Sequence, residues 1–507
     1  MKSIRIVILN NMTRFIRIPI LFTLILFVFF PCIAQHSFEL SFGETNSNNN
    51  IACSFEYQDA YYVAGNKGIS EGSLISSAVV YKISKMGEIL AQAAFPKVDS
   101  NYALYFGFPK QNGNLQFIGT LSADADYPNF ASFTYLCELT PDLEMVWEKI
   151  DTIPALALNI NKHYLVNYLI SSEEEIIVQG KIDTVAYGTN DILFLSKYDK
   201  QGNRIYFNIY SQWQDHGVAS ELIFNTDSTG FYLIGGLNLN SVFKSWIEFN
   251  LELDMLTSGT LTDENSLLLS PINVVRLDNN NIFIANNLAE FDNLYNYGIE
   301  LRLYTPELEL IKTAIYYTQQ KVYTPLKQGI GHVNDDYIWV AAFEEVPATG
   351  IPGSEDIIIL VFDSELNLLG EKVHHGDTRF WIYNLMSCSD MGCLITGIVP
   401  EYGGADWPDN YLLKVELDDV ITSMIDHFNP KQRIAIHPVP TKDMITLKDV
   451  PESSVLLFYT PSGRQVASFR LEEGENHLEI GYLPAGIYYA SIIQNQQSIQ
   501  TSKIIKQ

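Results

Sequence analysis

The sequence predicts an all-β protein in which a seven-bladed β-propeller is followed by a small immunoglobulin-like β-sandwich. Three observations predict it. Apolar and polar residues alternate over short runs bounded by Gly, Asn, Asp and Pro, which favours strands over helices. A strand-like motif recurs along most of the chain, and its pattern gives way to different turns after Ile434. The composition is that of a globular protein, with 47% hydrophobic and 18% charged residues among 507.

Residues 1–34 are expected to be a signal peptide. Basic residues precede an apolar run of 13 residues from Ile18 to Phe30, which fits a signal sequence and is short for a membrane span. Cys32-Ile33-Ala34 has the small-x-small pattern of a cleavage site and would leave Gln35 as the new N-terminus. The chain is therefore expected to enter the periplasm and to have no integral membrane span once the signal is removed.

Residues 35–423 are expected to form the propeller. Each repeat has an apolar run that ends near a small residue, at intervals of 51 to 61 residues: Gly65, Gly119, Gly180, Gly235, Asn286, Ala341 and Gly397. A polar loop and one or two further apolar strands follow most copies. Four-stranded units at about this period are typical of propellers, in which each sheet packs against its two neighbours.

The seventh repeat lacks a convincing outer strand. The segment "SFELSFGET" (Ser37–Thr45) resembles the outer-strand ending "EKVHHGDT" (Glu371–Thr378) of the repeat before it. We therefore expect Phe38–Phe42 to complete blade seven and to close the ring. The alternative is that this segment is the first strand of blade one.

The loops that follow the motif strands should all emerge on one face of the ring. They combine aromatic and acidic residues, and such side chains on the loops of a rigid scaffold are typical of a binding rim. Sugars stack on aromatic rings and form hydrogen bonds with carboxylates. The alternative is solvated loops with incidental aromatics. The candidate ligand-binding residues are Tyr127, Tyr187, Tyr295, Tyr297, Tyr402, Trp407, Asp124, Asp126, Asp292 and Asp406.

Motifs for metal, nucleotide or nucleophilic chemistry are not found, so no catalytic residue, metal or cofactor is assigned. Paired carboxylates for glycoside chemistry stay open, because propeller sites assemble from distant loops. The net charge of −27 argues against a nucleic-acid partner. Cys388 and Cys393 flank a turn, which allows either a cross-hairpin disulfide or two free buried thiols.

Residues 434–507 show β-sandwich patterning, with turns at Pro-Ser-Gly and Pro-Ala-Gly. Its distinctive residues are Pro438, Pro440 and Thr441 at the start, Gly463 in the middle, Leu483, Gly486 and Tyr488 in "LPAGIYYASI", and Lys503 and Lys506 at the end. Through these residues the block resembles the type A C-terminal sorting domain of the bacterial type IX secretion system. His437 and Val439 depart from the family's opening motif.

The resemblance implies that the type IX secretion machinery exports the chain to the extracellular space or the outer cell surface. It also implies that the domain is removed, with residues 424–433 as the linker that is cut, and that the cargo is released or attached to surface lipopolysaccharide. For the propeller we expect binding of a glycan or protein ligand without catalysis. The alternatives are a secreted glycan hydrolase or lyase that uses loop carboxylates, and a structural or adhesive surface component.

Overall fold

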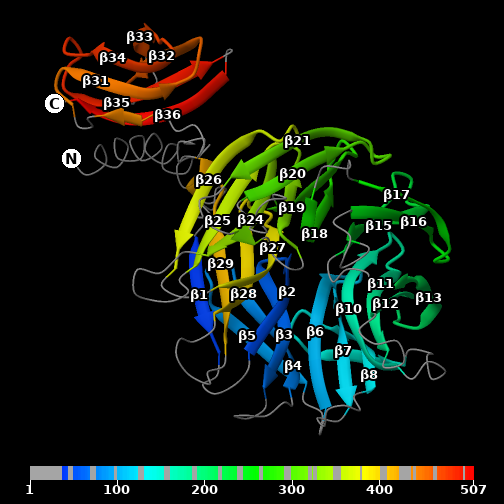
Figure 1. Ribbon diagram of the computed structural model, residues 1–507. Coiled ribbons are helices and arrows are strands. Elements are labelled where there is room, and N and C mark those ends of the chain that lie inside the picture. The colour runs from blue at the N-terminus through cyan, green and yellow to red at the C-terminus, as the bar shows by residue number, and fades with distance from the viewer. Residues whose placement is uncertain are drawn as a thin grey trace, which may run out of the picture. The chain divides into compact units, whose positions relative to one another are not determined.

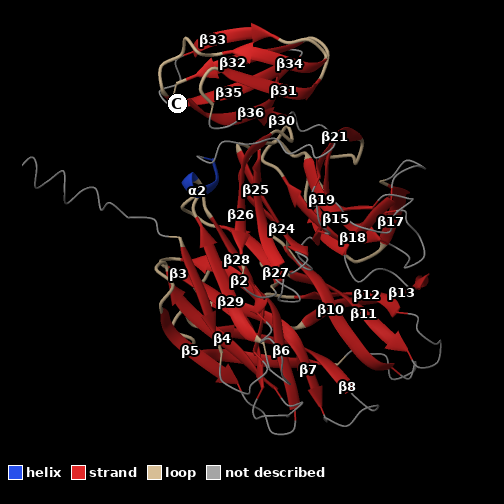
Figure 2. Cartoon of the chain, turned by 60° about the vertical axis from the view of Figure 1, so that its left-hand side comes forward, coloured by secondary structure: helices blue, strands red, loops and turns tan. Residues whose placement is uncertain are grey.

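A computed structural model describes the protein at residues 37–43, 49–68, 76–95, 100–123, 131–152, 160–184, 191–214, 220–236, 244–261, 267–289, 298–317, 322–323, 328–345, 355–376, 380–399, 408–421, 435–437, 441–460, 465–494 and 497–506. Strands account for nearly all of its regular structure, and the described helix is the short α2 (Asp418–Ile421) (Figure 2). The predicted signal peptide and linker lie outside the described residues.

Seven antiparallel sheets follow one another along the chain and form the blades of a propeller (Figure 1). Blades one to three are β2 (Asn49–Tyr57), β3 (Ala60–Gly68), β4 (Ser76–Ser84), β5 (Ile89–Phe95); β6 (Ser100–Pro109), β7 (Leu115–Ala123), β8 (Ala131–Leu139), β9 (Met145–Asp151); and β10 (Ile160–Ile170), β11 (Ile176–Thr184), β12 (Asp191–Tyr198), β13 (Arg204–Gln214). Blades four and five are β14 (Ser220–Phe224), β15 (Gly230–Gly236), β16 (Lys244–Asn250), β17 (Met255–Thr260); and β18 (Leu267–Arg276), β19 (Ile282–Ala289), β20 (Gly298–Tyr304), β21 (Leu310–Tyr317).

Blades six and seven depart from this order. In blade six the innermost strand has two pieces, and the strands are β22 (Val322–Tyr323), β23 (Ile330–Asn334), β24 (Tyr337–Glu345), β25 (Glu355–Phe362) and β26 (Leu368–His375). Blade seven combines both ends of the propeller chain: β27 (Trp381–Ser387), β28 (Cys393–Val399), β29 (Asp409–Val415) and then β1 (Phe38–Phe42). The β1 strand pairs antiparallel with β29, from Phe38 opposite Lys414 to Phe42 opposite Asn410. The predicted completion of blade seven is confirmed, and blue β1 lies beside orange β29 in Figure 1.

A separate apolar cluster fills each of the seven interfaces between neighbouring blades. The cluster that joins blade seven to blade one contains Leu394 and Leu412 together with Ile51 and Tyr61. Each sheet therefore buries both faces against its neighbours, which a single twisted sheet cannot do. The seven-bladed propeller that the repeats predict is confirmed by this ring of sheets and interfaces.

The glycines of the repeated motif have a steric cause. In blades one, two, three and seven the innermost strand bulges by one residue, at Ala52, Tyr105, Val166 and Tyr383, opposite the motif glycine. At the bulge a backbone carbonyl enters the space of the missing side chain. A Cβ on Gly119, for example, would clash with the carbonyl oxygen of Ala103. Bulges re-aim side chains, and here they set which residues face the propeller axis.

The turns between the third and fourth strands of blades one to six share a single design. In "TPDLE" (Thr140–Glu144) the Thr140 hydroxyl accepts a hydrogen bond from the amide of Glu144, and the fourth residue, Leu143, has a φ of 66°. This is a three-residue hairpin loop that ends in a left-handed residue. The same position holds Gly87, Gly202, Leu253, Leu308 and Leu366 in other blades. We call this end of the propeller the hairpin end, and the opposite end the loop end.

The outermost strands carry a second bulge directly after these turns. The extra residue is aliphatic in all six blades that have this strand in sequence: Leu90, Val146, Ile205, Leu256, Ile311 and Leu369. The first five are 43–56% exposed. Leu369 is partly buried in the cluster that contains Val420 of α2. A bulge on an open edge disfavours pairing with another sheet.

The C-terminal sandwich has two sheets. One contains β30 (Ala435–His437), β31 (Met444–Val450) and β34 (Gly474–Glu479). The other contains β33 (Gln465–Arg470), β32 (Ser454–Tyr459), β35 (Gly486–Gln494) and β36 (Gln497–Lys506). Ile445, Leu447, Phe458 and Ile504 meet in its core. The Tyr488 hydroxyl donates to the carbonyl of Pro484 at 2.8 Å, like the tyrosine corner of immunoglobulin-like sandwiches. The predicted fold class is thus confirmed for this part too.

Candidate functional site

A cavity of about 210 Å³ lies on the propeller axis. Every blade supplies part of its lining, through the innermost strands β2, β6, β10, β14, β18 and β27 and through Gln328, which precedes β23. The lining residues are Ala52, Cys53, Ser54, Tyr105, Phe106, Gly107, Asn167, Tyr168, Glu221, Leu222, Val274, Gln328 and Asn384. We call this the axial cavity.

Four blades place a polar side chain at one equivalent position near this cavity. Each of these side chains is on an innermost strand and pairs with the residue just before a motif end such as Gly180. The four residues are Asn167, Glu221, Asn273 and Asn384. The bulges on β10 and β27 come directly before Asn167 and Asn384, so the bulge turns these amides toward the axis. Asn273 Oδ1 accepts a hydrogen bond of 2.6 Å from the amide of Gly329.

Glu221 is the carboxylate of this set. Asn167 Nδ2 donates a short hydrogen bond to Glu221 Oε2. Burial raises the pKa of Glu221 to about 8, and the hydrogen bond from Asn167 offsets only part of that effect. No lysine, arginine or histidine is among the described residues that line the cavity. Glu221 is therefore mostly protonated at neutral pH, and its carboxyl group can both donate and accept a hydrogen bond.

An aromatic wall faces these polar groups. The Tyr168 ring lies 4.8 Å from Phe106 and 5.9 Å from Phe108, between ring centroids, with the second pair stacked. Burial raises the pKa of Tyr168 and of Tyr105, so both phenols stay protonated and uncharged. The cavity thus combines apolar ring surface with a few uncharged polar groups, as small-molecule sites do.

Asn384 has an incomplete set of hydrogen bonds. Its side chain is 4% exposed, and Nδ2 donates to the Ser54 hydroxyl at 3.1 Å, across the joint between blades seven and one. Its Oδ1 atom is buried without a partner. A buried acceptor left unpaired costs about 1–3 kcal/mol. Asn384 lines the axial cavity, and a turn of its side chain would bring Oδ1 within reach of a donor there.

The predicted rim residues lie outside the described residues. This holds for all ten, namely Tyr127, Tyr187, Tyr295, Tyr297, Tyr402, Trp407, Asp124, Asp126, Asp292 and Asp406. The strands that border their segments end at the loop end of the blades, and the rim stays a prediction.

Sequence reasoning missed Glu221, Asn167 and Asn384. One signal was present, because a polar residue interrupts an apolar strand 13 or 14 residues before the motif end at Gly180, Gly235, Asn286 and Gly397. Its meaning depends on the register of the inner strands, which a bulge sets before Asn167 and Asn384, and the polar residue alone does not show that register.

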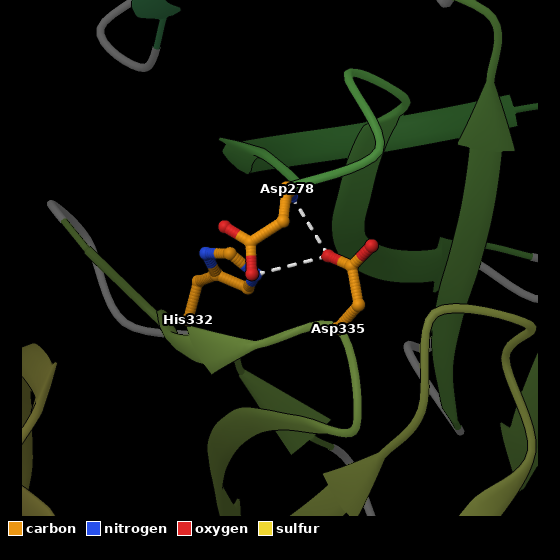
Figure 3. Close-up of side chains that lie close together, drawn as sticks. All are labelled: Asp278, His332 and Asp335. Atoms are coloured by element: carbon orange, nitrogen blue, oxygen red, sulfur yellow. Dashed lines mark hydrogen bonds and ion pairs between the residues drawn. The ribbon is translucent and has the colours of Figure 1, made fainter.

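A cluster of one histidine and two carboxylates lies at the hairpin end. Asp278, His332 and Asp335 place their ligand atoms within 4.8 Å of one another (Figure 3). Asp335 already accepts hydrogen bonds from the amides of Asp278 and Asn279, at 2.7 and 3.0 Å, and its Oδ1 lies 3.3 Å from His332 Nε2. These bonds join the turns of blades five and six.

The same kind of joint occurs elsewhere without a histidine. Glu174 accepts from the amide of Gln111, and Glu56 accepts from the amide of Ser389 at 2.7 Å, each across a blade boundary. The cluster of Asp278, His332 and Asp335 is therefore explained as a contact that joins blades, and no metal role is assigned to it.

Cys388 and Cys393 are both free and buried. Cys388 packs in the cluster between blades seven and one, and Cys393 packs in the cluster between blades six and seven. The two thiols thus face opposite sides of one sheet, which favours free thiols over the disulfide. Burial raises the pKa of both thiols, so they stay protonated.

The sorting-motif residues that the structure describes have structural roles. Thr441 is 2% exposed, donates to the carbonyl of Met444 at 2.6 Å and bridges to Lys506 in the last strand. Leu483 and Tyr488 lie in the sandwich core. Gly486 begins β35, Lys503 lies in β36, and nothing in the structure explains the glycine. Pro438, Pro440 and Gly463 lie outside the described residues.

Solved structures share only distant likeness with the chain. PorZ, an essential surface component of the type IX secretion system of Porphyromonas gingivalis, is 10% identical with a TM-score of 0.34, over 90% of this chain and 75% of that one. The polysaccharide lyase Uly1 is 10% identical with a TM-score of 0.44, over 72% of this chain and 90% of that one. A β-1,3-galactosidase of glycoside hydrolase family 43 is 8% identical with a TM-score of 0.31, over 69% and 76%. Likeness this weak carries no argument about function.

No curated protein sequence matches the chain significantly. Within the part that the structure describes, none of the helices has the length and apolar character to cross a membrane. The family model of the secretion system C-terminal sorting domain matches residues 435–507. This match and the sandwich fold confirm the resemblance that the motifs indicated. The chain thus ends in a type IX secretion sorting domain, which directs its export to the cell surface or the extracellular space.

Proposed function

We propose that the exported propeller is a binding protein that takes part of a glycan or protein ligand into its axial cavity without catalysis. The observation that supports this most is the cavity lining, in which all seven blades meet and Glu221 is the one carboxylate among the described residues. Glycoside hydrolysis in most families needs two carboxyl groups about 5–9.5 Å apart. The described lining offers one.

The size of the cavity limits what enters it. Its volume of about 210 Å³ is below the range of about 300–1,000 Å³ that is usual for drug-sized ligands. We infer that the cavity holds one small unit at the end of a larger ligand. The predicted aromatic and acidic rim, from Tyr127 to Trp407, would contact the rest of that ligand.

Filling the cavity tests this proposal. Ala52 is a bulge residue that lines the cavity and is 7% exposed, so Ala52→Phe should place a ring in the cavity. Binding to a glycan and peptide array by the secreted protein should be lost in this variant. The control is Met86→Phe, at an exposed turn of the hairpin end. Unchanged binding by an Ala52→Phe variant with a normal thermal midpoint would refute the proposal.

A glycan hydrolase or lyase is the alternative that Glu221 itself favours, because a carboxyl group with a raised pKa is typical of a general acid. Glu221→Gln keeps the shape and the neutral state but cannot transfer a proton. If the propeller is an enzyme, this variant should bind glycan and lose turnover of it. If it is a binding protein, neither the wild type nor the variant should release a product from a glycan that it binds.

The route of export gives a further proposal. We infer that the chain loses residues 1–34 on entering the periplasm and loses the sorting domain by a cut within residues 424–433. Mass spectrometry of the mature protein should then show an N-terminus at Gln35 and a C-terminus in that linker. Removing β36, which contains Lys503 and Lys506, should retain the protein in the periplasm. Secretion of the truncated chain at the wild-type level would contradict this.

A further inference from the structure

The charges around the axial cavity restrict the class of ligand. The described lining has no cationic side chain that could pair with a carboxylate or sulfate. The chain as a whole carries a net charge of −27, which repels anions at long range. An anionic sugar such as a uronate would lose its hydration in the cavity and gain no counter-charge.

A cationic ligand would pair with Glu221 only by displacing its proton, because an opposite charge within a few ångströms favours the charged form. The described lining supplies no second carboxylate to such a ligand. Asn167 on β10 donates to Glu221, and Tyr168 on β10 lies close enough to interact with it electrostatically. The other titratable side chains of the described lining are Tyr105 on β6 and Cys53 on β2. With its pKa raised to about 8 by burial, Glu221 offers a neutral carboxyl group.

The polar atoms of the cavity require hydrogen-bond donors and acceptors rather than charges. Asn384 Oδ1 is buried and lacks a donor. The protonated Glu221 carboxyl can donate and accept, and the Ser54 hydroxyl and the Gln328 amide lie along the same lining. Tyr168 and Phe106 supply ring surface against which C–H groups can pack. Hydroxyl groups on a compact carbon ring meet all of these requirements together.

We propose that the axial cavity binds an uncharged sugar unit at the end of a glycan, with one sugar hydroxyl donating to Asn384 Oδ1 and others exchanging hydrogen bonds with Glu221. This inference rests on the proposed function and names its ligand class. In this inference the protonated Glu221 carboxyl group donates a hydrogen bond to the sugar. An ionised carboxylate would have no O–H to donate, and its charge would have no cationic partner in the described lining. Sugar binding should therefore weaken as the pH rises through about 8.

The test uses the full secreted chain and saturation-transfer NMR at pH 6.5. The probes are the methyl glycosides of neutral hexoses and pentoses, with glucuronic acid, N-acetylneuraminic acid and glucosamine as charged counterparts. At least one neutral glycoside should bind, and each charged probe should bind at least about tenfold more weakly. Asn384→Leu should weaken the neutral sugar about tenfold or more, since it removes the acceptor. Asn203→Leu, at an exposed turn of the hairpin end, is the matched control.

The pH dependence gives a second readout. Wild-type affinity should fall several-fold between pH 7 and pH 9, whereas Glu221→Gln should bind equally at both. Tighter binding of a charged sugar, or full affinity in Asn384→Leu, would overturn the inference. If a charged sugar binds and Ala52→Phe abolishes that binding, the axial cavity is still the binding site and only the assignment of an uncharged ligand is wrong. If Ala52→Phe changes the binding of no ligand, both the proposed function and the ligand class are wrong.

Discussion

The innermost and outermost strands of the blades use the same backbone device and place different demands on the sequence. A one-residue bulge lies on the innermost strand in blades one, two, three and seven, and on the outermost strand in blades one to six. The inner bulge pushes a carbonyl into the space of its partner's side chain, so the partner must be glycine, as at Gly65 and Gly119. The outer bulge faces solvent, so its partners vary and the extra residue needs only to be aliphatic. The glycines that make the repeat visible in the sequence are therefore set by the innermost strands and not by the outermost ones.

Blade seven is the exception that tests this comparison, because its outer strand has a closing role. β1 pairs with β29 without a bulge, and Phe38, Leu40 and Phe42 pack against the cluster that joins blades seven and one. An outer strand elsewhere covers one blade. This one joins the two ends of the ring.

The largest effect is expected from breaking that closing strand. Leu40→Ser combined with Phe42→Ser should lower the free energy of unfolding by about 4 kcal/mol, because two half-buried apolar side chains leave the joint. Urea titration followed by fluorescence measures it. Leu90→Ser on the outer strand of blade one, which is 54% exposed, is the control and should cost less than about 0.5 kcal/mol. Equal costs for the two variants would remove the special role of β1.

Disturbing an inner bulge should come next. Gly119→Val would drive its Cβ into the carbonyl of Ala103, and we expect a loss of about 3 kcal/mol and a lower thermal midpoint. The comparison variant is Thr257→Val, beside the outer bulge of blade four and exposed, where the effect should stay within about 0.5 kcal/mol. Tolerance of valine at residue 119 would show that the glycine is not set by the bulge.

The pH dependence of stability tests Glu221, which lies on the innermost strand of blade four. The folded-state pKa of Glu221 is about 8, above its ordinary value of 4.5, so the folded protein holds this proton more tightly than the unfolded chain. The stability that it contributes is complete below about pH 4.5 and is lost as the pH rises to about 8. Between those limits the free energy of unfolding of Glu221→Gln should rise relative to that of the wild type by about 2 kcal/mol. This is less than the full pKa shift would give, because the carboxyl group is only partly buried. Parallel stability curves for the two proteins would contradict the raised pKa.

The smallest effect is expected at the outer bulges. Leu256→Ser removes a side chain that is 56% exposed, and the free energy of unfolding should change by less than about 0.5 kcal/mol. Calorimetry would detect a larger change. A loss above about 1 kcal/mol would mean that the outer bulge residues are covered in the native protein.

The repeat predicted the ring, whereas the cavity could not be read from it. The motif ends from Gly65 to Gly397 give the blade number because they recur once in every blade, and in four blades the inner bulge demands a glycine there. Ser37–Thr45 revealed the closing strand through its likeness to another outer strand. The cavity draws one to three residues from each blade, and a motif glycine does not show which side chain of the opposite strand turns toward the axis. Asn167 and Asn384 therefore look like isolated polar residues in apolar strands.

The pairing of β1 with β29 also has a mechanical consequence. Phe38, the first residue of β1, lies opposite Lys414, near the last residue of β29, so the chain enters and leaves blade seven at the same end. Tension between the two termini would therefore peel the strands apart like a zipper, one residue pair after another from Phe38, instead of shearing all pairs at once. A propeller pulled by both ends of its chain would therefore open at blade seven before any other blade.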